Sequence, residues 1–342
     1  MRVDFLIVGQ GLAGSVLALE LIEADRRVLV IDNGHRSAAS RAAAGIVNPV
    51  TGKRLAPSWR VETLLPAALE YYLRWERRHG VTVFQPRRMR RYLTPRQRDR
   101  YWPRRLASGE LNAYLADPAA AGPDSVFLDF EPAGYVDTAL FLDTCAGFLA
   151  SRDALRRSTF AGDELRIGRT EVTWCDVRAD KIIFCEGYKA ATNPYFDWLP
   201  FTPAKGEILT LNAPALTADT IRNNGNWLLP LGDGRARVGA TYEWKRLDET
   251  PTAAARTELE RAFTALSGEP AGEVLEHRAG VRSVLKDTKP VLGLHPGFDA
   301  VGIFNGLGSK GVLVAPHFAR CLADHLVSGR PLDDEVDVRR NV

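Results

Sequence analysis

A glycine-rich turn between a strand-like and a helix-like apolar run constrains the fold of this 342-residue chain more than any other feature. The stretch DFLIVGQGLAGSVLALELIEADRRVLVID occupies residues 4–32. Gly9, Gly11 and Gly14 follow the first apolar run, and Asp32 ends the second one. The order strand, turn, helix, strand, acid is the context in which a GxGxxG pattern indicates a dinucleotide-binding site.

The three glycines have separate physical roles in such a site. Gly9 permits the tight turn, Gly11 lets backbone N–H groups approach a pyrophosphate, and Gly14 lets the helix pack closely on the strand. The helix N-terminus adds partial positive charge for the phosphates, and Asp32 can accept hydrogen bonds from a ribose. The pattern alone does not separate FAD from NAD, and a glycine turn without a ligand is the competing interpretation.

The composition argues against several other classes of protein. Only Arg2 precedes the first apolar run and Asp4 interrupts it, so a secretory signal is not indicated. No segment contains eighteen uncharged apolar residues, so we expect neither a membrane-spanning helix nor a membrane partner. The four cysteines show no CxxC and no ligand spacing. This usage is typical of a reduced, cytoplasmic protein with no disulfide framework and no metal site.

Positive charge is concentrated in one segment. Residues 87–105 hold nine arginines against one aspartate, a net of +8, so a chain of net charge +3 carries −5 elsewhere. Thr94 to Gln97 is typical of a helix start, after which Arg96, Arg100 and Arg104 share one helix face. A basic patch can indicate nucleic acid. A solvated surface in an arginine-rich chain is the simpler interpretation, and both stay open.

The remaining patterns predict strand-rich segments inserted between two βα regions. Helices are expected at 63–79 (with Pro66 in the first turn), 136–149, 252–266 and 311–327. Strands are expected at 81–84, 89–93, 155–160, 171–175, 181–185, 208–211, 227–231 and 235–240, with a hairpin turn at 232–234. Residues 37–54 and the last dozen residues are expected to form a loop and a loose tail.

This pattern predicts an α/β fold with two domains. A Rossmann-like nucleotide-binding domain with a parallel sheet would comprise residues 1–80, 134–198 and 278–342. An inserted, mainly antiparallel α+β domain would comprise residues 81–133 and 199–277. A chain of this length typically forms about two such domains.

A second glycine cluster precedes the last predicted helix. The stretch FNGLGSKG contains Gly306, Gly308, Ser309 and Lys310 and leads directly into the helix start at Gly311. A helix N-terminus stabilises a nearby anion, so this segment is a candidate second contact for the same cofactor. A tight turn before a surface helix is the alternative.

Several blocks of the chain resemble one family, the FAD-dependent amine and amino-acid oxidoreductases of the glycine oxidase, sarcosine oxidase and D-amino acid oxidase type. The blocks are GQGLAG with Asp32, SRAAAGIVNP, KIIFCEG, PAKGEIL, VGATYE, AGVRSVLKDTKPVLG and FNGLGSKGVLVAP. The last two look most similar to the oxidase domain of the bifunctional enzyme that modifies wobble uridine in tRNA, and next to glycine oxidase.

The resemblance implies that the nucleotide domain binds FAD and that the inserted domain binds substrate. FAD would be noncovalent, because no cysteine lies near Gly280, where some sarcosine oxidases attach it. Leu313 stands where those enzymes carry a substrate-binding lysine. The implied cofactor contacts are Gly9, Gly11, Gly14, Asp32, Ser40, Arg41, Gly45, Gly187, Gly306, Gly308, Ser309 and Lys310.

The resemblance also implies a substrate site around Arg282. Its guanidinium matches the group that grips the substrate carboxylate through two parallel hydrogen bonds, with a surface ion pair as the alternative. Tyr242 is a candidate pocket residue or a packed sheet tyrosine. The implied reaction moves a hydride from the carbon beside the nitrogen to flavin N5, and no catalytic side chain is assigned.

Three functions follow in order of preference. The first is FAD-dependent oxidation of the C–N bond of a small amino acid or secondary amine bearing a carboxylate. The second is oxidation of a carboxymethylaminomethyl-type group of tRNA, favoured by FNGLGSKG and the arginine segment. The third is an electron-transfer flavoprotein without turnover of its own. The sequence indicates no oligomeric state.

Overall fold

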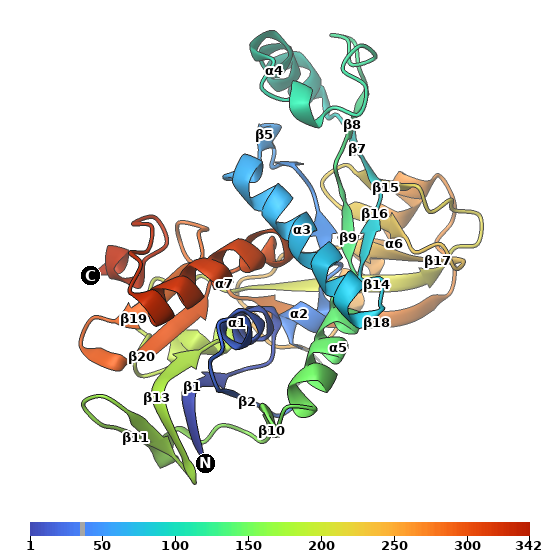
Figure 1. Ribbon diagram of the computed structural model, residues 1–342. Coiled ribbons are helices and arrows are strands. Elements are labelled where there is room, and N and C mark those ends of the chain that lie inside the picture. The colour runs from blue at the N-terminus through green and yellow to red at the C-terminus, as the bar shows by residue number, and fades with distance from the viewer. Residues whose placement is uncertain (35–37) are drawn as a thin grey trace.

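The structure is a computed structural model that describes residues 1–34 and 38–342, and its largest element is an eight-stranded sheet (Figure 1). The strands of this sheet are β1 (Arg2–Val8), β2 (Val28–Asp32), β10 (Leu155–Arg157), β11 (Leu165–Ile167), β12 (Val172–Trp174), β13 (Val177–Phe184), β19 (Val291–His295) and β20 (Phe298–Asn305). The central strands β10, β2, β1, β13 and β20 pair in parallel. The strands β11, β12 and β19 pair antiparallel beside them.

The register of the parallel strands brings their carboxyl ends to one edge. Val8 pairs with both Ile31 and Phe184, and Phe184 pairs with Ile303. The residues that follow these strands therefore meet at the same edge, where open α/β sheets bind their ligands. Both predicted glycine clusters begin there.

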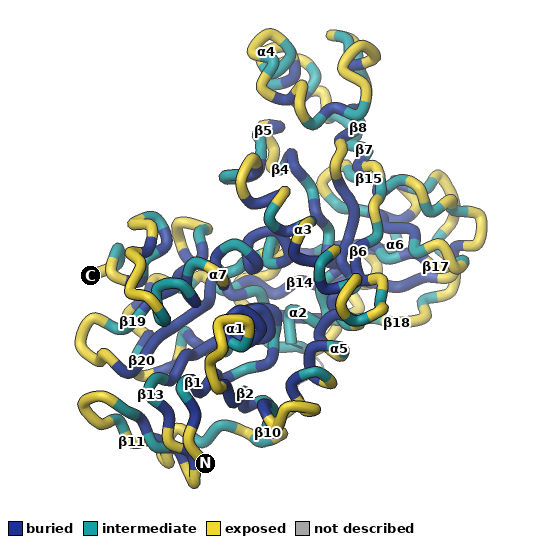
Figure 2. Tube along the Cα trace, in the orientation of Figure 1, coloured by how far each residue is buried: buried dark blue, intermediate teal, exposed yellow. Residues whose placement is uncertain are grey.

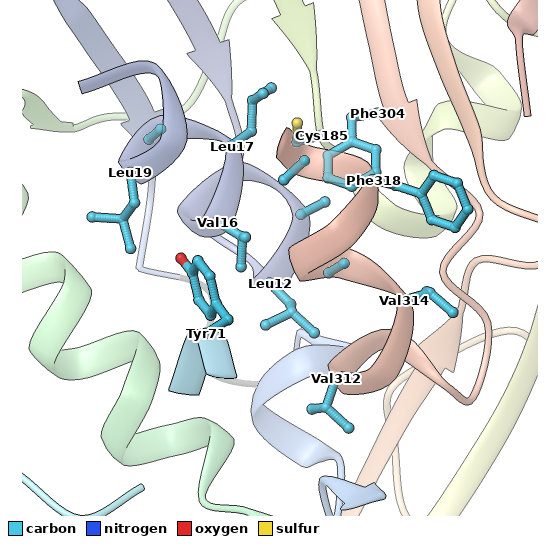
Figure 3. Packing of buried hydrophobic residues seen from close by; sticks show 14 of the residues in the cluster. Leu12, Val16, Leu17, Leu19, Tyr71, Cys185, Phe304, Val312, Val314 and Phe318 are labelled. Carbon is cyan, nitrogen blue, oxygen red and sulfur yellow. The ribbon is translucent and has the colours of Figure 1, made fainter. Parts of the chain in front are cut away.

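Four helices build the largest apolar core against one face of this sheet: α1 (Leu12–Glu23), α3 (Val61–His79), α5 (Thr138–Ala150) and α7 (Gly311–Ser328). Helix α1 packs against both α5 and α7, and Figure 3 shows α1 with Val16 and Leu17 next to α7, whose Val314 and Phe318 point to its other side. Val16 and Leu17 are fully buried, and each such side chain contributes roughly 1.5–3 kcal/mol. This core holds the first turns of α1 and α7 in place.

A second, seven-stranded sheet lies beside the parallel one (Figure 1). Its order is β18 (Val274–Arg282), β14 (Ala204–Asn212), β17 (Arg235–Gly239), β16 (Trp227–Pro230), β15 (Thr220–Asn223), β7 (Arg88–Tyr92) and β8 (Phe127–Phe130). Only β15 and β7 pair in parallel. Helix α6 (Ala253–Ser267) covers one face, with Thr252 as its cap and Gly268 ending it. The predicted α/β class with a second, mainly antiparallel sheet is confirmed.

The antiparallel register assigns one face of this sheet to the candidate substrate site. Directly paired residues point to the same face, and Ala204 pairs with Arg282 while Gly206 pairs with Gly280. Arg282 and Gly206 are therefore neighbours on the face opposite α6. Leu209 and Leu211 alternate to the other face, where they pack on α6.

Shorter elements connect the two large sheets. A three-stranded sheet contains β3 (Ile46–Val47), β9 (Gly134–Val136) and β6 (Phe84–Pro86), and a hairpin contains β4 (Val50–Thr51) and β5 (Ala56–Pro57). Beyond β7 the chain forms the short π-helix η1 (Gln97–Tyr101), helix α4 (Trp102–Ser108) and the 3₁₀ helix η2 (Asn112–Tyr114). Figure 1 shows α4 on a projection away from the parallel sheet. The other short helices are α2 (Ala39–Ala42), η3 (Gly162–Glu164), η4 (Gly187–Thr192) and η5 (Val338–Asn341).

Several local predictions differ from the structure. The strand expected at 81–84 begins only at Phe84, and α3 begins at Val61, so Pro66 is its sixth residue rather than part of the first turn. The loop expected at 37–54 contains α2, β3 and β4; its first residue, Ser37, lies outside the described residues. The predicted domain boundary at 277/278 falls inside β18, which belongs wholly to the antiparallel sheet.

The expected loose tail is instead packed on the parallel sheet. Val336 and Val338 are buried, and Asp337 forms a bridge with Leu292. These two buried valines anchor the segment. The five charged residues around them, at 333–335 and 339–340, made the segment look like an exposed tail in the sequence. No helix in the described part of the chain is both long and apolar enough to cross a bilayer.

Candidate cofactor and substrate site

The first glycine turn is held by close backbone contacts that exclude larger residues. Gly9 has φ +102°, and a Cβ added to it would lie 2.6 Å from the carbonyl oxygen of Cys185. A Cβ on Gly14 would lie 1.9 Å from the carbonyl oxygen of Gly9. Packing alone therefore requires these two glycines. At Gly11 the nearest atom to an added Cβ is Ser40 Oγ, at 3.4 Å, so only this glycine leaves the helix start open to a ligand.

Two polar side chains shape the turn. Asp32 accepts hydrogen bonds from the Gln10 N–H at 2.8 Å and the Gly34 N–H at 2.6 Å, and Arg157 lies 3.4 Å from the same carboxylate. The Ser40 hydroxyl accepts a hydrogen bond from the Leu12 N–H at 3.0 Å. Asp32 thus lies beside the turn with lone pairs left for further donors. Ser40 brings α2 over the N-terminus of α1.

The next two predicted contacts, Arg41 and Gly45, have structural partners of their own. The Arg41 guanidinium forms an ion pair with Asp143 of α5 at 2.7 Å, and its carbonyl accepts a hydrogen bond from Arg278 at 3.2 Å. Gly45 has φ +69°, and a Cβ there would lie 1.9 Å from the carbonyl oxygen of Val136. This segment therefore ties the parallel sheet to the second sheet, whatever else it contacts.

The second glycine cluster lies at the same sheet edge. The Asn305 side chain donates to the carbonyl of Gly187 at 2.9 Å, which links the ends of β20 and β13. Gly187, Gly306 and Gly308 all have positive φ, at +58°, +73° and +57°. The Gly308 N–H donates to the Ser283 carbonyl at 2.8 Å, which brings the cluster against the end of β18. No atom lies within 4 Å of a Cβ added to Gly187, so its surroundings are open.

Lys310 stands at the start of α7. Its ammonium donates to the Thr51 hydroxyl at 2.9 Å, and burial lowers its pKa. Leu12 lies 3.0 Å from a Cβ added at Gly311, so the first turns of α1 and α7 touch, as Figure 3 shows with Leu12 and Val312. Ser309 is exposed in the preceding turn. Two helix N-termini therefore present partial positive charge to one region.

Arg282, at the end of β18, has no acidic partner among the described residues. A Cβ added to Gly206 would lie 2.1 Å from its Nη2, so the guanidinium lies flat against that glycine. The hydrogen bonds that it forms with the described residues are long ones, of 3.4–3.5 Å, to the carbonyls of Lys205 and Thr241. Burial lowers its pKa. Arg282 therefore does not form the surface ion pair that was its alternative role.

The ring of Tyr242 covers this guanidinium and is itself stacked on Trp244. The Tyr242 ring lies 4.4 Å from the Arg282 Cζ and stacks on Trp244 at 5.9 Å. Tyr242 and Trp244 are 54% and 63% exposed, so Tyr242 is not packed in the sheet. The backbone of Glu243 between them exchanges two hydrogen bonds with Lys205, at 2.8 and 3.0 Å. The pair is thus fixed to β14 while its rings face solvent.

Sequence reasoning missed three residues of this site. Gly206 makes room for Arg282, Trp244 supports Tyr242, and the Ser283 hydroxyl is buried without a hydrogen-bond partner in the described structure. None belongs to a motif with fixed spacing, because strand pairing alone brings them together. Leu313, in place of the sarcosine oxidase lysine, is buried in α7.

The polar groups of this site suit an extended dinucleotide and do not suit a metal ion. An open glycine at a helix start, an acid at the end of β2, a second helix start and an unpartnered buried hydroxyl all lie along one edge. Within residues 1–34 and 38–342, no group of three or more His, Cys, Asp or Glu side chains could hold a metal ion.

Comparison with known proteins agrees with this geometry. The family model described as FAD dependent oxidoreductase (DAO) matches residues 4–325. Glycine oxidase of Pseudomonas aeruginosa is 27% identical, over 95% of this chain and 94% of that protein. The tRNA 5-methylaminomethyl-2-thiouridine biosynthesis bifunctional protein MnmC of Marinobacter nauticus is 26% identical over 94% of this chain. The alignment spans only 55% of that bifunctional protein.

Solved structures give the same fold. Iminodiacetate oxidase from Chelativorans sp. BNC1 superposes with a TM-score of 0.78 at 25% identity, over 97% of this chain and 98% of that one. Glycine oxidase from Geobacillus kaustophilus superposes with a TM-score of 0.77 at 22% identity, over 97% and 96% of the two chains.

Proposed function

The chain belongs to the family of FAD-dependent oxidoreductases, and we propose that it oxidises the C–N bond of a small amino acid or secondary amine bearing a carboxylate. The observation that carries this proposal is the half-buried Arg282, whose guanidinium has no acidic partner within residues 1–34 and 38–342 and lies beside the second glycine cluster. An unpaired guanidinium withdrawn from water is costly, and a substrate carboxylate would neutralise it.

The residues of the sheet edge would hold FAD noncovalently. Gly11 and the start of α1 would receive the pyrophosphate, and Asp32 the adenosine ribose. Bound FAD supplies the acceptor for a hydride leaving the carbon beside the nitrogen. Lys310 and the start of α7 would place positive charge at the far end of the site.

The chain's own contribution to the reaction is orientation. Arg282 would fix the carboxylate at one end of the substrate, which sets the direction of the adjacent carbon. Gly206 holds the guanidinium flat against β14, so its two Nη atoms keep a constant orientation. Tyr242 and Trp244 would cover the bound substrate and limit its contact with water.

A second candidate substrate is a carboxymethylaminomethyl group carried by tRNA. The MnmC proteins of Marinobacter nauticus and Caulobacter vibrioides match 94% of this chain, and this observation favours the candidate. Such a group presents the same carboxylate to Arg282. A third candidate, an electron-transfer flavoprotein, would leave Arg282 without a ligand.

Anaerobic reduction of the bound flavin tests the proposed function. Glycine, N-methylglycine and iminodiacetate each carry a carboxylate, whereas glycinamide is the matched amine without one. We expect the flavin absorbance near 450 nm to bleach with at least one of the three and at least 100-fold more slowly with glycinamide. If dithionite bleaches the flavin and none of the three carboxylate amines does, oxidation of a small amine is ruled out, and the tRNA-borne group and electron transfer remain as the candidates.

The Tyr242 ring is expected to affect KM for the amine more than the Tyr242 hydroxyl does. The ring lies over Arg282, and a cation–π contact of this kind is worth roughly 0.5–2 kcal/mol. Tyr242→Phe retains the ring, so KM for the best amine should change by less than about threefold. Tyr242→Ala should raise KM about tenfold. Steady-state kinetics of both variants check this, and equal effects would show that the hydroxyl, not the ring, contacts substrate.

A further inference from the structure

Five arginine side chains line one cavity. In the sequence these arginines are distant from both glycine turns. The cavity has a volume of about 420 Å³ and is lined by Arg54, Arg96, Arg100, Tyr101, Arg104 and Arg105. We call it the arginine cleft. The charge count at 87–105 left two interpretations open, a solvated surface or a nucleic-acid contact. The convergence of these side chains on a single hollow favours a bound anion.

The cleft is built by defined contacts. Thr94 and Gln97 form the predicted capping box, with the Thr94 N–H donating to Gln97 Oε1 at 3.0 Å and the Gln97 N–H to Thr94 Oγ1 at 3.3 Å. The Gln97 amide donates to the carbonyl of Lys53 at 3.2 Å, and Arg105 Nε donates to that of Arg54 at 3.3 Å. The helix is thereby fixed against the β4–β5 hairpin, and the two together form the cleft walls.

The charges of the cleft are mostly uncompensated. Arg105 pairs with Glu110, but in the described part of the chain Arg54, Arg96, Arg100 and Arg104 form no ion pair with an acidic side chain. Two of the three arginines of β7 behave differently, since Arg88 and Arg90 pair with Asp129 and Glu131, whereas Arg91 bonds to the Asn223 side chain.

This contrast separates the cleft from an ordinary basic surface. Four of the five arginines, Arg54, Arg96, Arg100 and Arg104, are exposed, and Figure 2 shows exposed residues around α4. Water and salt screen much of the repulsion between them, and an anion in the cleft would remove more of it. Guanidinium groups match phosphate oxygens through paired hydrogen bonds.

The hairpin also places the cleft near the proposed active site. Thr51 accepts the hydrogen bond from Lys310 at the start of α7, and Arg54 follows three residues later. Three extended residues span at most about 10 Å. Figure 1 shows the hairpin between α3 and the projection that carries α4. A strand held in the cleft could therefore place a neighbouring nucleotide beside Lys310.

We propose that the arginine cleft binds the phosphodiester backbone of a folded RNA. Tyr101, flanked by Arg96 and Arg100 at 5.9 and 5.8 Å, adds an aromatic ring of the kind that single-strand sites use. The proposal deepens the second candidate function by naming the surface that such an RNA would use. RNA binding is measured without turnover, so its outcome is independent of whether any amine is oxidised.

Binding of a labelled bulk tRNA to the FAD-loaded protein tests the proposal. The cleft variant is Arg96→Gln, Arg100→Gln, Arg104→Gln. The control is Arg26→Gln, Arg169→Gln, Arg320→Gln, which removes the same charge from exposed sites elsewhere. At 0.1 M salt we expect about 100-fold weaker binding for the cleft variant and a salt slope smaller by about 2–3. We expect less than threefold weakening for the control.

Three results would overturn the proposal. The first is equal weakening in both variants, which would show general electrostatic attraction. The second is displacement of tRNA by poly-L-glutamate at equal charge, which would favour an acidic protein. The third is displacement by millimolar inorganic phosphate, which would indicate a small-anion site.

A measurement on the wild-type protein covers the case in which the cleft variant folds poorly. Hydrogen exchange with and without tRNA should show protection at residues 94–108 and in the hairpin at 50–57. Protection confined to other segments would contradict the proposal.

Discussion

Replacing Arg282 by alanine is expected to lower kcat/KM for carboxylate-bearing amines by about 10³-fold while FAD stays bound. Two hydrogen bonds from a guanidinium to a carboxylate are each worth roughly 1.5–3 kcal/mol, and their loss removes both affinity and orientation. Among the described residues Arg282 contacts the Tyr242 ring and two carbonyls but no acidic side chain, so the alanine variant leaves no buried charge behind. Stopped-flow reduction of the flavin and its absorbance ratio at 280 and 450 nm measure the two effects.

The control for this variant uses both a conservative substitution and a different substrate. Arg282→Lys keeps the charge but loses the planar pair of donors, so an intermediate loss is expected. Reduction by an amine without a carboxylate, such as glycinamide, should be equally slow in wild type and Arg282→Ala. A variant that loses the same factor with both amines would show that Arg282 supports the fold rather than the carboxylate.

The N-terminal part of the fold was predictable because its signals are local. Gly9, Gly11, Gly14 and Asp32 lie within one strand-turn-helix-strand unit, and the close contacts that require Gly9 and Gly14 lie within that unit or at the end of the adjacent strand β13. Helix ends at Gly80, Gly268 and Gly329 were likewise visible, since each is a left-handed glycine cap.

The substrate site was predictable only in part. The resemblance pointed to Arg282, but the residues that shape its surroundings come from strand pairing across long sequence distances. Gly206 lies 76 positions before Arg282 in the sequence and pairs with Gly280. Trp244 is held in place by the backbone bridge between Glu243 and Lys205. Neither has a spacing that a single sequence displays.

The prediction of a loose tail was wrong, and the two interpretations of the arginine segment stayed open, for a related reason. Polar residues surround Val336 and Val338, so local composition indicated a loose end, although tertiary contact buries both. In the arginine segment, charge counting could not distinguish Arg88 and Arg90, which are paired with acids, from Arg96, Arg100 and Arg104, which have no acidic partner in the described part of the chain. That distinction depends on Asp129 and Glu131, which lie about forty residues away.

Replacing Gly14 by alanine is expected to raise the Kd for FAD at least 100-fold. The new Cβ would lie 1.9 Å from the carbonyl oxygen of Gly9, so α1 must move away from the turn that would receive the pyrophosphate. The same change at Gly147, an exposed position of α5 with no atom within 4 Å, is the matched control. Gly147→Ala should leave the Kd unchanged and stabilise the protein by roughly 0.5–1 kcal/mol. Flavin fluorescence titration of the apoproteins and thermal unfolding measure both.

Gly11→Ala separates cofactor binding from folding. An alanine Cβ at this position meets only Ser40 Oγ at 3.4 Å, so the apoprotein should unfold at nearly the wild-type temperature. The methyl group nevertheless occupies the open side of the turn, where the backbone N–H groups would meet the pyrophosphate, so FAD should bind at least tenfold more weakly. Because packing explains Gly9 and Gly14 but not Gly11, unchanged FAD affinity in Gly11→Ala would remove the reason for placing the pyrophosphate there. The turn would then be a purely structural joint between β1, α1 and β13.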